Sequence, residues 1–353
     1  MSARSDLTFN VGQRDLAFHG SEIEAPDSGG ARASNRGTSV AKGSPTGLLL
    51  GLCLTCAIGP AQDLAPRAYM ITPVHANAVT LTFSYFTGSI EFSQAFPITD
   101  ASGNPKLEIF SLYHSLNFFG RSSNIVAFVP YGFGNFQGNV NGTQGRIYRS
   151  GLLDAVFRFS VNLKGGPAMS PQEFRSWRQK TLLGASLTVV APTGQYDPTR
   201  LINQSSNRWA FKPELGVSRR WGDWVLDAYG GVWFFTTNPE FFSHNQFNPG
   251  TVTQSQQPVG AFEGHLSYDV KHNPRFWVSL DGNFWFGGRT SLNGVENPLT
   301  YERNSRIGAT VAVPVTNHQS LKFSYSDGAY IRYGGNYQNV SAAWQYSWVG
   351  RPR

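Results

Sequence analysis

Residues 153–163 read LDAVFRFSVNL, and apolar and polar side chains alternate over most of this stretch. On an extended strand the apolar face is formed by Leu153, Phe157, Phe159, Val161 and Leu163. The polar face is formed by Asp154, Arg158, Ser160 and Asn162. Because successive side chains of a β-strand point to opposite faces, this period of two predicts a strand between an apolar and a polar environment.

The same alternation recurs along the chain from Val79 onward. It predicts twelve strands, at about 79–90, 106–119, 124–136, 146–163, 181–192, 207–219, 224–236, 258–271, 275–287, 305–315, 320–332 and 337–348. A membrane-spanning β-strand needs about 9–11 residues. Twelve strands with their connections therefore fit the length of the chain as one domain.

The predicted connections alternate between short and long. Short turns are expected at 120–123, 220–223, 272–274 and 316–319, and longer polar loops at 88–105, 193–206, 237–257 and 288–304. Long loops on one side and short turns on the other are typical of outer-membrane barrels. We therefore predict an all-β fold, a 12-stranded antiparallel transmembrane β-barrel with up-and-down meander topology over residues 79–350.

One connection, residues 164–180, is long where a short turn is expected. It contains Ser170-Pro171-Gln172-Glu173, which has the spacing of a capping box with proline at the first helical position. The sequence therefore predicts a short periplasmic helix near 171–179.

The composition favours a membrane barrel over a soluble β-sandwich. Charged residues make up 14% of the chain and aromatic residues another 14%, whereas roughly 25% of an ordinary soluble domain is charged. Membrane barrels place aromatic girdles at both interfaces. Six tryptophans are predicted near strand ends, namely Trp209, Trp221, Trp224, Trp277, Trp344 and Trp348.

The N-terminal part is divided into three segments. Residues 1–39 are interpreted as a disordered extension, or as sequence upstream of a true translation start near Val40. Residues 40–61 have a basic flank, the apolar core GLLLGLCLTCAIG and small residues before Ala61, which predicts a signal peptide cleaved near Ala61. Residues 62–78 would then form an N-terminal periplasmic segment or a plug of the barrel.

Several kinds of site are not expected. Both cysteines, Cys53 and Cys56, lie inside the predicted signal core, so their Cys-x-x-Cys spacing does not indicate redox or metal chemistry. The histidines lack metal-ligand spacing, and we predict no metal and no cofactor. The net charge is +7, but the basic residues are scattered, so no nucleic-acid partner is expected.

The alternation places eleven ionisable side chains toward the barrel interior. Six of them are predicted to line a substrate path through the lumen, namely Asp154, Arg158, Asp227, Glu263, Asp269 and Asp281. The other five are Lys212, Glu214, His265, Arg306 and Lys322. The alternative interpretation is a buried charge network that holds a narrow barrel together, because unpaired charges there would be costly.

We expect the protein not to be an enzyme and predict no catalytic residues. His114 lies on an apolar face, while Ser111 and Ser115 lie on the opposite face. A Ser-His triad requires the two side chains within reach of each other. An outer-membrane hydrolase therefore remains only a weaker alternative.

Two further stretches resemble a known family. Residues 187–197 read LTVVAPTGQYD and residues 207–216 read NRWAFKPELG. These stretches resemble the family labelled "meta-pathway of phenol degradation". The shared order is a strand, Pro-Thr-Gly-x-Tyr, a polar loop and then Asn-x-Trp-x-Phe-x-Pro-x-Leu-Gly. The resemblance extends over residues 80–350 and implies an outer-membrane β-barrel transporter.

The resemblance implies a porin-like channel in the bacterial outer membrane for passive uptake of small molecules, including hydrophobic or aromatic ones. The alternative is a non-transport structural or adhesive surface protein whose long loops, especially 237–257, bind a partner; a plugged lumen would favour it. Expected partners are outer-membrane lipid, the small-molecule solute and the outer-membrane insertion machinery. One departure is the C-terminus, where Trp348 is followed by 349–353, whereas barrels commonly end on an aromatic residue read by that machinery.

Overall fold

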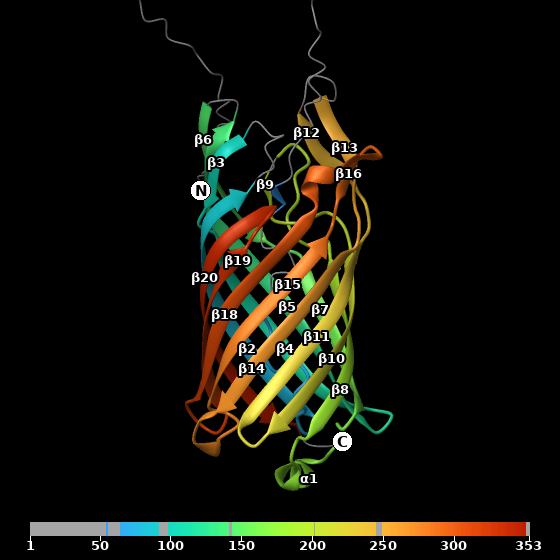
Figure 1. The fold of residues 1–353 in the computed structure, drawn as a ribbon, viewed down its shortest axis with the longest axis vertical. Coiled ribbons are helices and arrows are strands. Elements are labelled where there is room, and N and C mark those ends of the chain that lie inside the picture. The colour runs from blue at the N-terminus through green and yellow to red at the C-terminus, as the bar shows by residue number, and fades with distance from the viewer. Residues whose placement is uncertain are drawn as a thin grey trace, which may run out of the picture. The chain divides into compact units, whose positions relative to one another are not determined.

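Twelve strands of the chain close into an antiparallel barrel (Figure 1). The computed structural model describes residues 54–55, 64–91, 98–140, 143–200, 202–244 and 249–350, all within the compact unit Leu48–Arg353. In order around the barrel, the strands are β2 (Ala76–Glu91), β4 (Lys106–Phe118), β5 (Arg121–Val140), β7 (Ala155–Lys164), β8 (Thr181–Ala191), β10 (Ala210–Trp221), β11 (Trp224–Phe235), β14 (Val259–Asp269), β15 (Trp277–Gly287), β18 (Glu302–Pro314), β19 (Gln319–Tyr330) and β20 (Gly334–Val349).

Each of these strands pairs with the next, and the first pairs with the last. The closing pair, β2 with β20, runs in register from Ala76↔Val349 to Glu91↔Gly334. The predicted meander of twelve antiparallel strands is therefore confirmed. The predictions for residues 1–39 and for a signal peptide at 40–61 fall, apart from Leu54 and Thr55, outside the described residues.

Short elements extend the wall at one end, which we call the loop end (Figure 1). They are β3 (Ile98–Gly103), β6 (Thr143–Leu152) and the four-stranded sheet of β12 (Asn238–His244), β13 (Pro249–Gln256), β16 (Thr290–Leu292) and β17 (Val295–Asn297). The short 3₁₀ helix η3 (Pro298–Thr300) follows β17, and β1 (Leu54–Thr55) pairs in parallel with β9 (Ile202–Asn203). The opposite end, which we call the turn end, has the short connections, the 3₁₀ helix η2 (Val270–His272) and helix α1 (Pro171–Ser176).

Helix α1 begins at the predicted capping box. The Ser170 N–H donates to Glu173 Oε2 at 2.8 Å, and the Glu173 N–H donates to Ser170 Oγ at 3.3 Å. The predicted helix is confirmed but ends at Ser176 rather than at 179, because Trp177 is already extended, with φ −71° and ψ 144°. Among the described residues, no helix is long and apolar enough to cross a lipid bilayer.

We expect Ser170→Ala to fray α1 and leave the barrel intact. The hydrogen bonds from Ser170 lower the pKa of the Glu173 carboxyl below 4.5, so the cap stabilises α1 above that pH and is lost as the pH falls through the lowered value. Hydrogen exchange of the amides of 172–176 measures the fraying. Exchange that is equally slow in the variant at pH 7 would contradict the role of the cap.

The predicted strand 146–163 is broken in the middle. It consists of β6 and β7, which pair with different halves of β5. At the break, Leu153 packs against the inward apolar cluster that contains Leu107 and Phe136, and its N–H donates to Pro130 O at 2.9 Å. The prediction missed this break because Leu153 has the same parity as Phe157 and was placed on the same face, whereas in the structure Leu153 packs inward and Phe157 is exposed.

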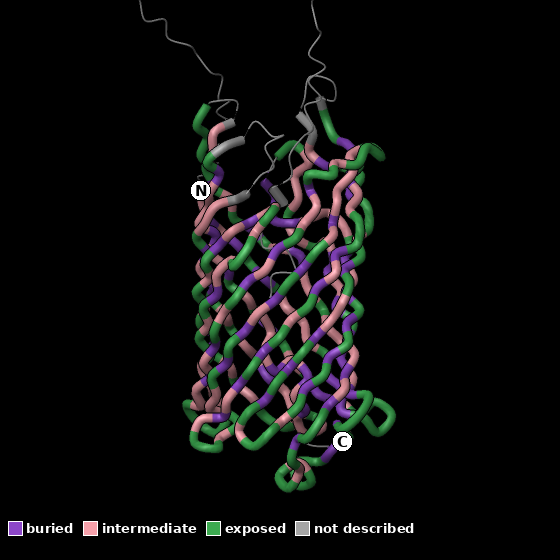
Figure 2. Tube along the Cα trace, viewed as in Figure 1, coloured by how far each residue is buried: buried purple, intermediate pink, exposed green. Residues whose placement is uncertain are grey.

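The outer face of the barrel is apolar on all twelve strands. Buried and exposed residues alternate along each strand in Figure 2, and every strand has at least one exposed large hydrophobic side chain. Examples are Leu81, Leu112, Ile125, Phe157, Leu187, Leu215, Leu226, Phe262, Leu280, Ile307, Phe323 and Val340. A closed barrel with an apolar outer band is the arrangement of a transmembrane barrel, in which these side chains face lipid.

Five of the six girdle tryptophans are exposed at strand ends, namely Trp209, Trp221, Trp224, Trp344 and Trp348. The assignment of Trp277 to a girdle is wrong. Its ring lies inside the barrel under the guanidinium of Arg67, at 4.6 Å, because Trp277 alternates with the outward-facing Val278.

Candidate functional site: the barrel lumen

A segment that precedes the first barrel strand, residues 64–75, lies inside the barrel; we call it the inner segment. Its Tyr69 is 1% exposed. The Tyr69 hydroxyl donates to Glu214 Oε1 at 3.0 Å and lies 3.0 Å from Ser186 Oγ. The ring packs edge-on against Tyr229, with the centroids 5.1 Å apart. Tyr69 is therefore bound by inward-facing groups of β8, β10 and β11.

The space for the Tyr69 ring is created by two glycines. Gly184 of β8 and Gly216 of β10 are register partners, and a Cβ on either would overlap the Tyr69 ring. We call this pair the glycine recess. Since any larger residue would fill it, the wall has a shape that accepts the inner segment.

Arg67 binds the inner segment to the turn end of the lumen. Its Nη2 donates to Asp269 Oδ1 at 2.6 Å, and its backbone N–H donates to Asp227 Oδ2 at 3.2 Å. Arg220 Nη1 donates to the other oxygen of Asp269 at 2.5 Å. With its stacking on Trp277, Arg67 is held by three barrel strands.

The last part of the inner segment is held by the connection between β7 and β8. Ile71 is buried against Met169 and Leu182, and the Val74 N–H donates to Met169 O at 2.9 Å. The Thr72 hydroxyl lies 2.8 Å from the hydroxyl of Tyr113 in β4. The inner segment thus runs across the lumen from β14 to β4.

A second set of charges forms a continuous buried network. Arg158 Nη2 lies 3.4 Å from Glu214, Lys212 Nζ lies 2.7 Å from Glu214 and 3.3 Å from Glu263, and His265 lies 3.6 Å from Glu263 and 2.9 Å from Asp281. The Thr310 hydroxyl donates to Asp281 at 2.8 Å. We call these six residues, Arg158, Glu214, Lys212, Glu263, His265 and Asp281, the lumen network.

The structure brings most of the predicted path residues together. Arg158, Glu263 and Asp281 lie in the lumen network, while Asp227 and Asp269 bind Arg67. Asp154 lies apart, near the loop end, where it accepts hydrogen bonds from the backbone N–H groups of Gly194 and Ser206 at 3.1 and 2.9 Å.

Sequence reasoning missed three residues that form hydrogen bonds with other side chains inside the lumen, namely Arg67, Tyr69 and Arg220. The first two lie in a segment without strand periodicity. The signal that could have indicated them is the pair of inward-facing glycines, Gly184 and Gly216, in adjacent strands.

Toward the loop end the lumen becomes apolar. One cluster consists of Phe86, Ala101, Leu107, Phe136, Ile202 and Tyr337. The other consists of Val190, Ala210, Trp233, Val259, Ala261 and Trp285. A solute that entered at the loop end would meet aromatic and aliphatic side chains first and charged groups later.

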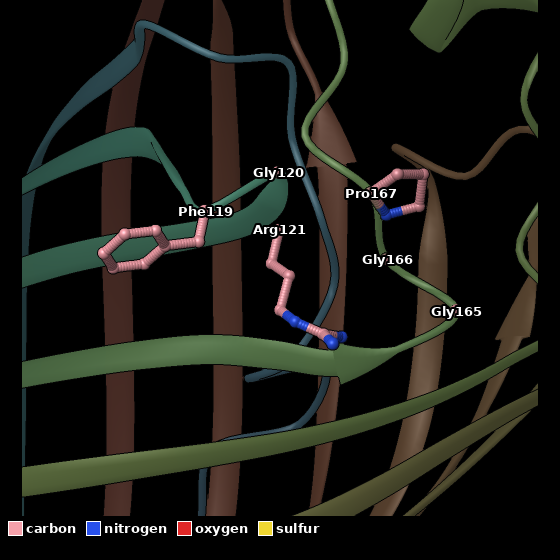
Figure 3. A pocket seen from close by; sticks show the side chains of 6 residues that line it. All are labelled: Phe119, Gly120, Arg121, Gly165, Gly166 and Pro167. Carbon is pink, nitrogen blue, oxygen red and sulfur yellow. The ribbon is translucent and has the colours of Figure 1, made fainter.

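An open pocket of about 330 Å³ lies at the turn end (Figure 3). It is lined by Phe119, Gly120, Arg121, Gly165, Gly166 and Pro167. The Arg121 guanidinium donates to the backbone oxygen of Leu163, and Phe119 points away from the pocket in Figure 3. The pocket therefore lies between two turns, and its charged lining residue, Arg121, is bonded to the backbone of Leu163.

The described residues contain no cluster of three or more His, Cys, Asp or Glu side chains that could hold a metal ion. His114 Nδ1 lies 2.7 Å from Asn77 Oδ1 on the outer face. The nearby Ser111 and Ser115 are buried on the inner face, so neither lies beside the imidazole as a nucleophile would.

The closed barrel with its apolar exterior and charged lumen defines a transmembrane β-barrel protein. The model of the family described as "Putative MetA-pathway of phenol degradation" matches residues 109–347. The chain belongs to this family.

Similar barrels are known from solved structures. The COG4313 outer membrane channel from Pseudomonas putida F1 aligns with a TM-score of 0.66 and 16% identity, covering 81% of this chain and 100% of that chain. It shares the fold. The beta domain of the Bordetella autotransporter BrkA aligns with a TM-score of 0.44 and 12% identity, covering 77% of this chain and 99% of that one. Among curated proteins, no sequence matches the chain significantly.

Proposed function

We propose that the protein is a channel of the bacterial outer membrane through which small molecules enter passively, and that the inner segment closes it at rest. The observation that supports this most directly is the lumen itself. It has aromatic walls at one end and a charged network further in, and among the described residues the inner segment crosses it. In this proposal the loop end faces outward, the turn end faces the periplasm, and lipid surrounds the apolar outer face.

We further propose that the solutes are small and hydrophobic or aromatic. The two apolar clusters toward the loop end support this, since aromatic surfaces bind apolar solutes. Of the predicted path residues, Asp154 would contact a solute near the loop end, and Arg158, Asp227, Glu263, Asp269 and Asp281 would contact it further along.

Reconstitution tests the channel. We expect proteoliposomes to swell faster in phenols than in sugars of similar size, because the apolar clusters favour apolar solutes, and we expect short fatty acids to fall between. Planar-bilayer recording measures ion conductance in parallel. Protein-free liposomes correct for diffusion through lipid. A folded, heat-modifiable barrel that shows neither conductance nor solute flux would contradict the channel.

The second candidate is a structural or adhesive surface barrel. The observation that favours it is the tight binding of the inner segment, with Arg67 and Tyr69 both buried. The same recordings distinguish the two functions, since a structural barrel would conduct neither ions nor solutes even when the inner segment is released.

A further inference from the structure

The lumen contains a buried cation outside the networks described above. Arg306 lies on the inner face of β18 and is 2% exposed. Its Nη1 donates to Ser326 Oγ at 3.0 Å. Within the described part of the chain, Nε and Nη2 of Arg306 have no hydrogen-bond partner. Its guanidinium interacts electrostatically with the Asp327 carboxylate of β19 but forms no hydrogen bond to it.

The two free donors lie on one edge of the guanidinium. Nε–H and an N–H of Nη2 point in the same direction, and this edge binds the two oxygens of a carboxylate side by side. Burying a charged group whose donors are only partly satisfied is costly. An anion that reached this edge would offset that cost, so the edge has both the geometry and the electrostatics of a carboxylate receptor.

Two aromatic residues of the apolar clusters are neighbours of Arg306. Arg306 pairs in register with Asn283, while Trp285, two residues closer to the loop end, pairs with Asn304. Trp285 and Arg306 are therefore diagonal neighbours on the inner wall. Trp285 belongs to one of the two apolar clusters of the lumen. Tyr337 belongs to the second of these clusters and lies close enough to Arg306 for an electrostatic interaction.

We propose that Arg306 is the carboxylate-binding residue of a solute site in the lumen, and that its ligands are small aromatic carboxylates such as benzoate. This inference rests on the proposed channel function and adds a solute class to it. The carboxylate binds the Nε/Nη2 edge, and the ring lies against the two apolar clusters. A neutral phenyl solute would use only the apolar walls, and a sugar would use neither.

The test compares Arg306→Gln with the wild-type barrel in proteoliposomes that hold benzoate or benzyl alcohol. We expect benzoate flux to fall by about tenfold or more, since hydrogen bonds to charged groups contribute that much to affinity, while benzyl alcohol flux changes little. Arg303→Gln is the matched control. Arg303 lies on the same strand but is exposed, with its guanidinium over Tyr330, and its loss should affect neither flux.

A second variant separates charge from geometry. Arg306→Lys keeps the charge and removes the two-donor edge, so its benzoate flux should lie between those of the wild type and Arg306→Gln. Equal losses of both solutes in a heat-modifiable Arg306→Gln barrel, or no loss of benzoate, would overturn the site and leave the channel standing. A wild-type barrel that passes neither solute would contradict the channel itself.

Discussion

Replacing Tyr69 with alanine should make the channel open for most of the recording time in planar bilayers. Tyr69 is buried in the glycine recess, and its hydroxyl donates to Glu214. Truncating a buried aromatic side chain costs about 3–5 kcal/mol, and each 1.4 kcal/mol corresponds to roughly tenfold. The ratio of bound to released inner segment should therefore fall by at least about a hundredfold.

Two further variants make this experiment specific. Gly216→Val changes the wall instead of the segment, and it should open the channel as well, because its side chain would occupy the space of the Tyr69 ring. His75→Asn is the control, since His75 is an exposed residue of the same segment. If Tyr69→Ala and Gly216→Val fold and neither raises the open fraction, the inner segment does not close the channel.

Replacing Lys212 with methionine should destabilise the barrel strongly. Lys212 lies between Glu214 and Glu263, 2.7 and 3.3 Å from their carboxylates, and methionine would fill similar space without a charge. Removing one partner from a buried ion pair costs about 3–5 kcal/mol because the remaining charges stay buried. Urea unfolding in detergent micelles, or the temperature at which the folded gel mobility is lost, measures the effect.

Lys322→Met is the matched control for Lys212. Lys322 also points inward from its strand, but it is exposed, and it forms no salt bridge in the part of the chain that the structure describes. Adding Glu263→Gln to Lys212→Met should recover part of the loss, because one uncompensated carboxylate is removed. Equal stability of Lys212→Met and the wild type would show that the lumen network does not hold the barrel together.

Alternation located the twelve barrel strands, apart from the break at Leu153 and Asp154, because a barrel wall separates two environments along every strand. The strand expected at 181–192 spans Thr181–Ala191, and the helix starts where the capping box predicted it. The same alternation identified the inward charges, since a polar residue between two lipid-facing ones points into the lumen.

The inner segment could not be predicted in the same way. Its side chains do not alternate between two environments along the sequence. Its contacts also join residues that are far apart in the sequence, such as Arg67 and Asp269. Trp277 shows a related limit, since its place near a strand end suggested a girdle although its alternation with Val278 put it inside. The strand break at Leu153 and Asp154 depends on packing against other strands. The sequence of one strand carries no information about that packing.

The closing pair of strands has a consequence for how the barrel is assembled. The inner segment leads directly into β2, and β2 pairs with β20, which follows the other barrel strands in the sequence. Because the segment crosses the interior, it must be inside before β20 joins β2, or it must later thread through an end of a finished barrel. On the first route, the pairing of β20 with β2 completes the wall and encloses the inner segment in the same step. We therefore expect barrel closure to be slow when Arg67 and Tyr69 do not form their contacts with the wall early in assembly.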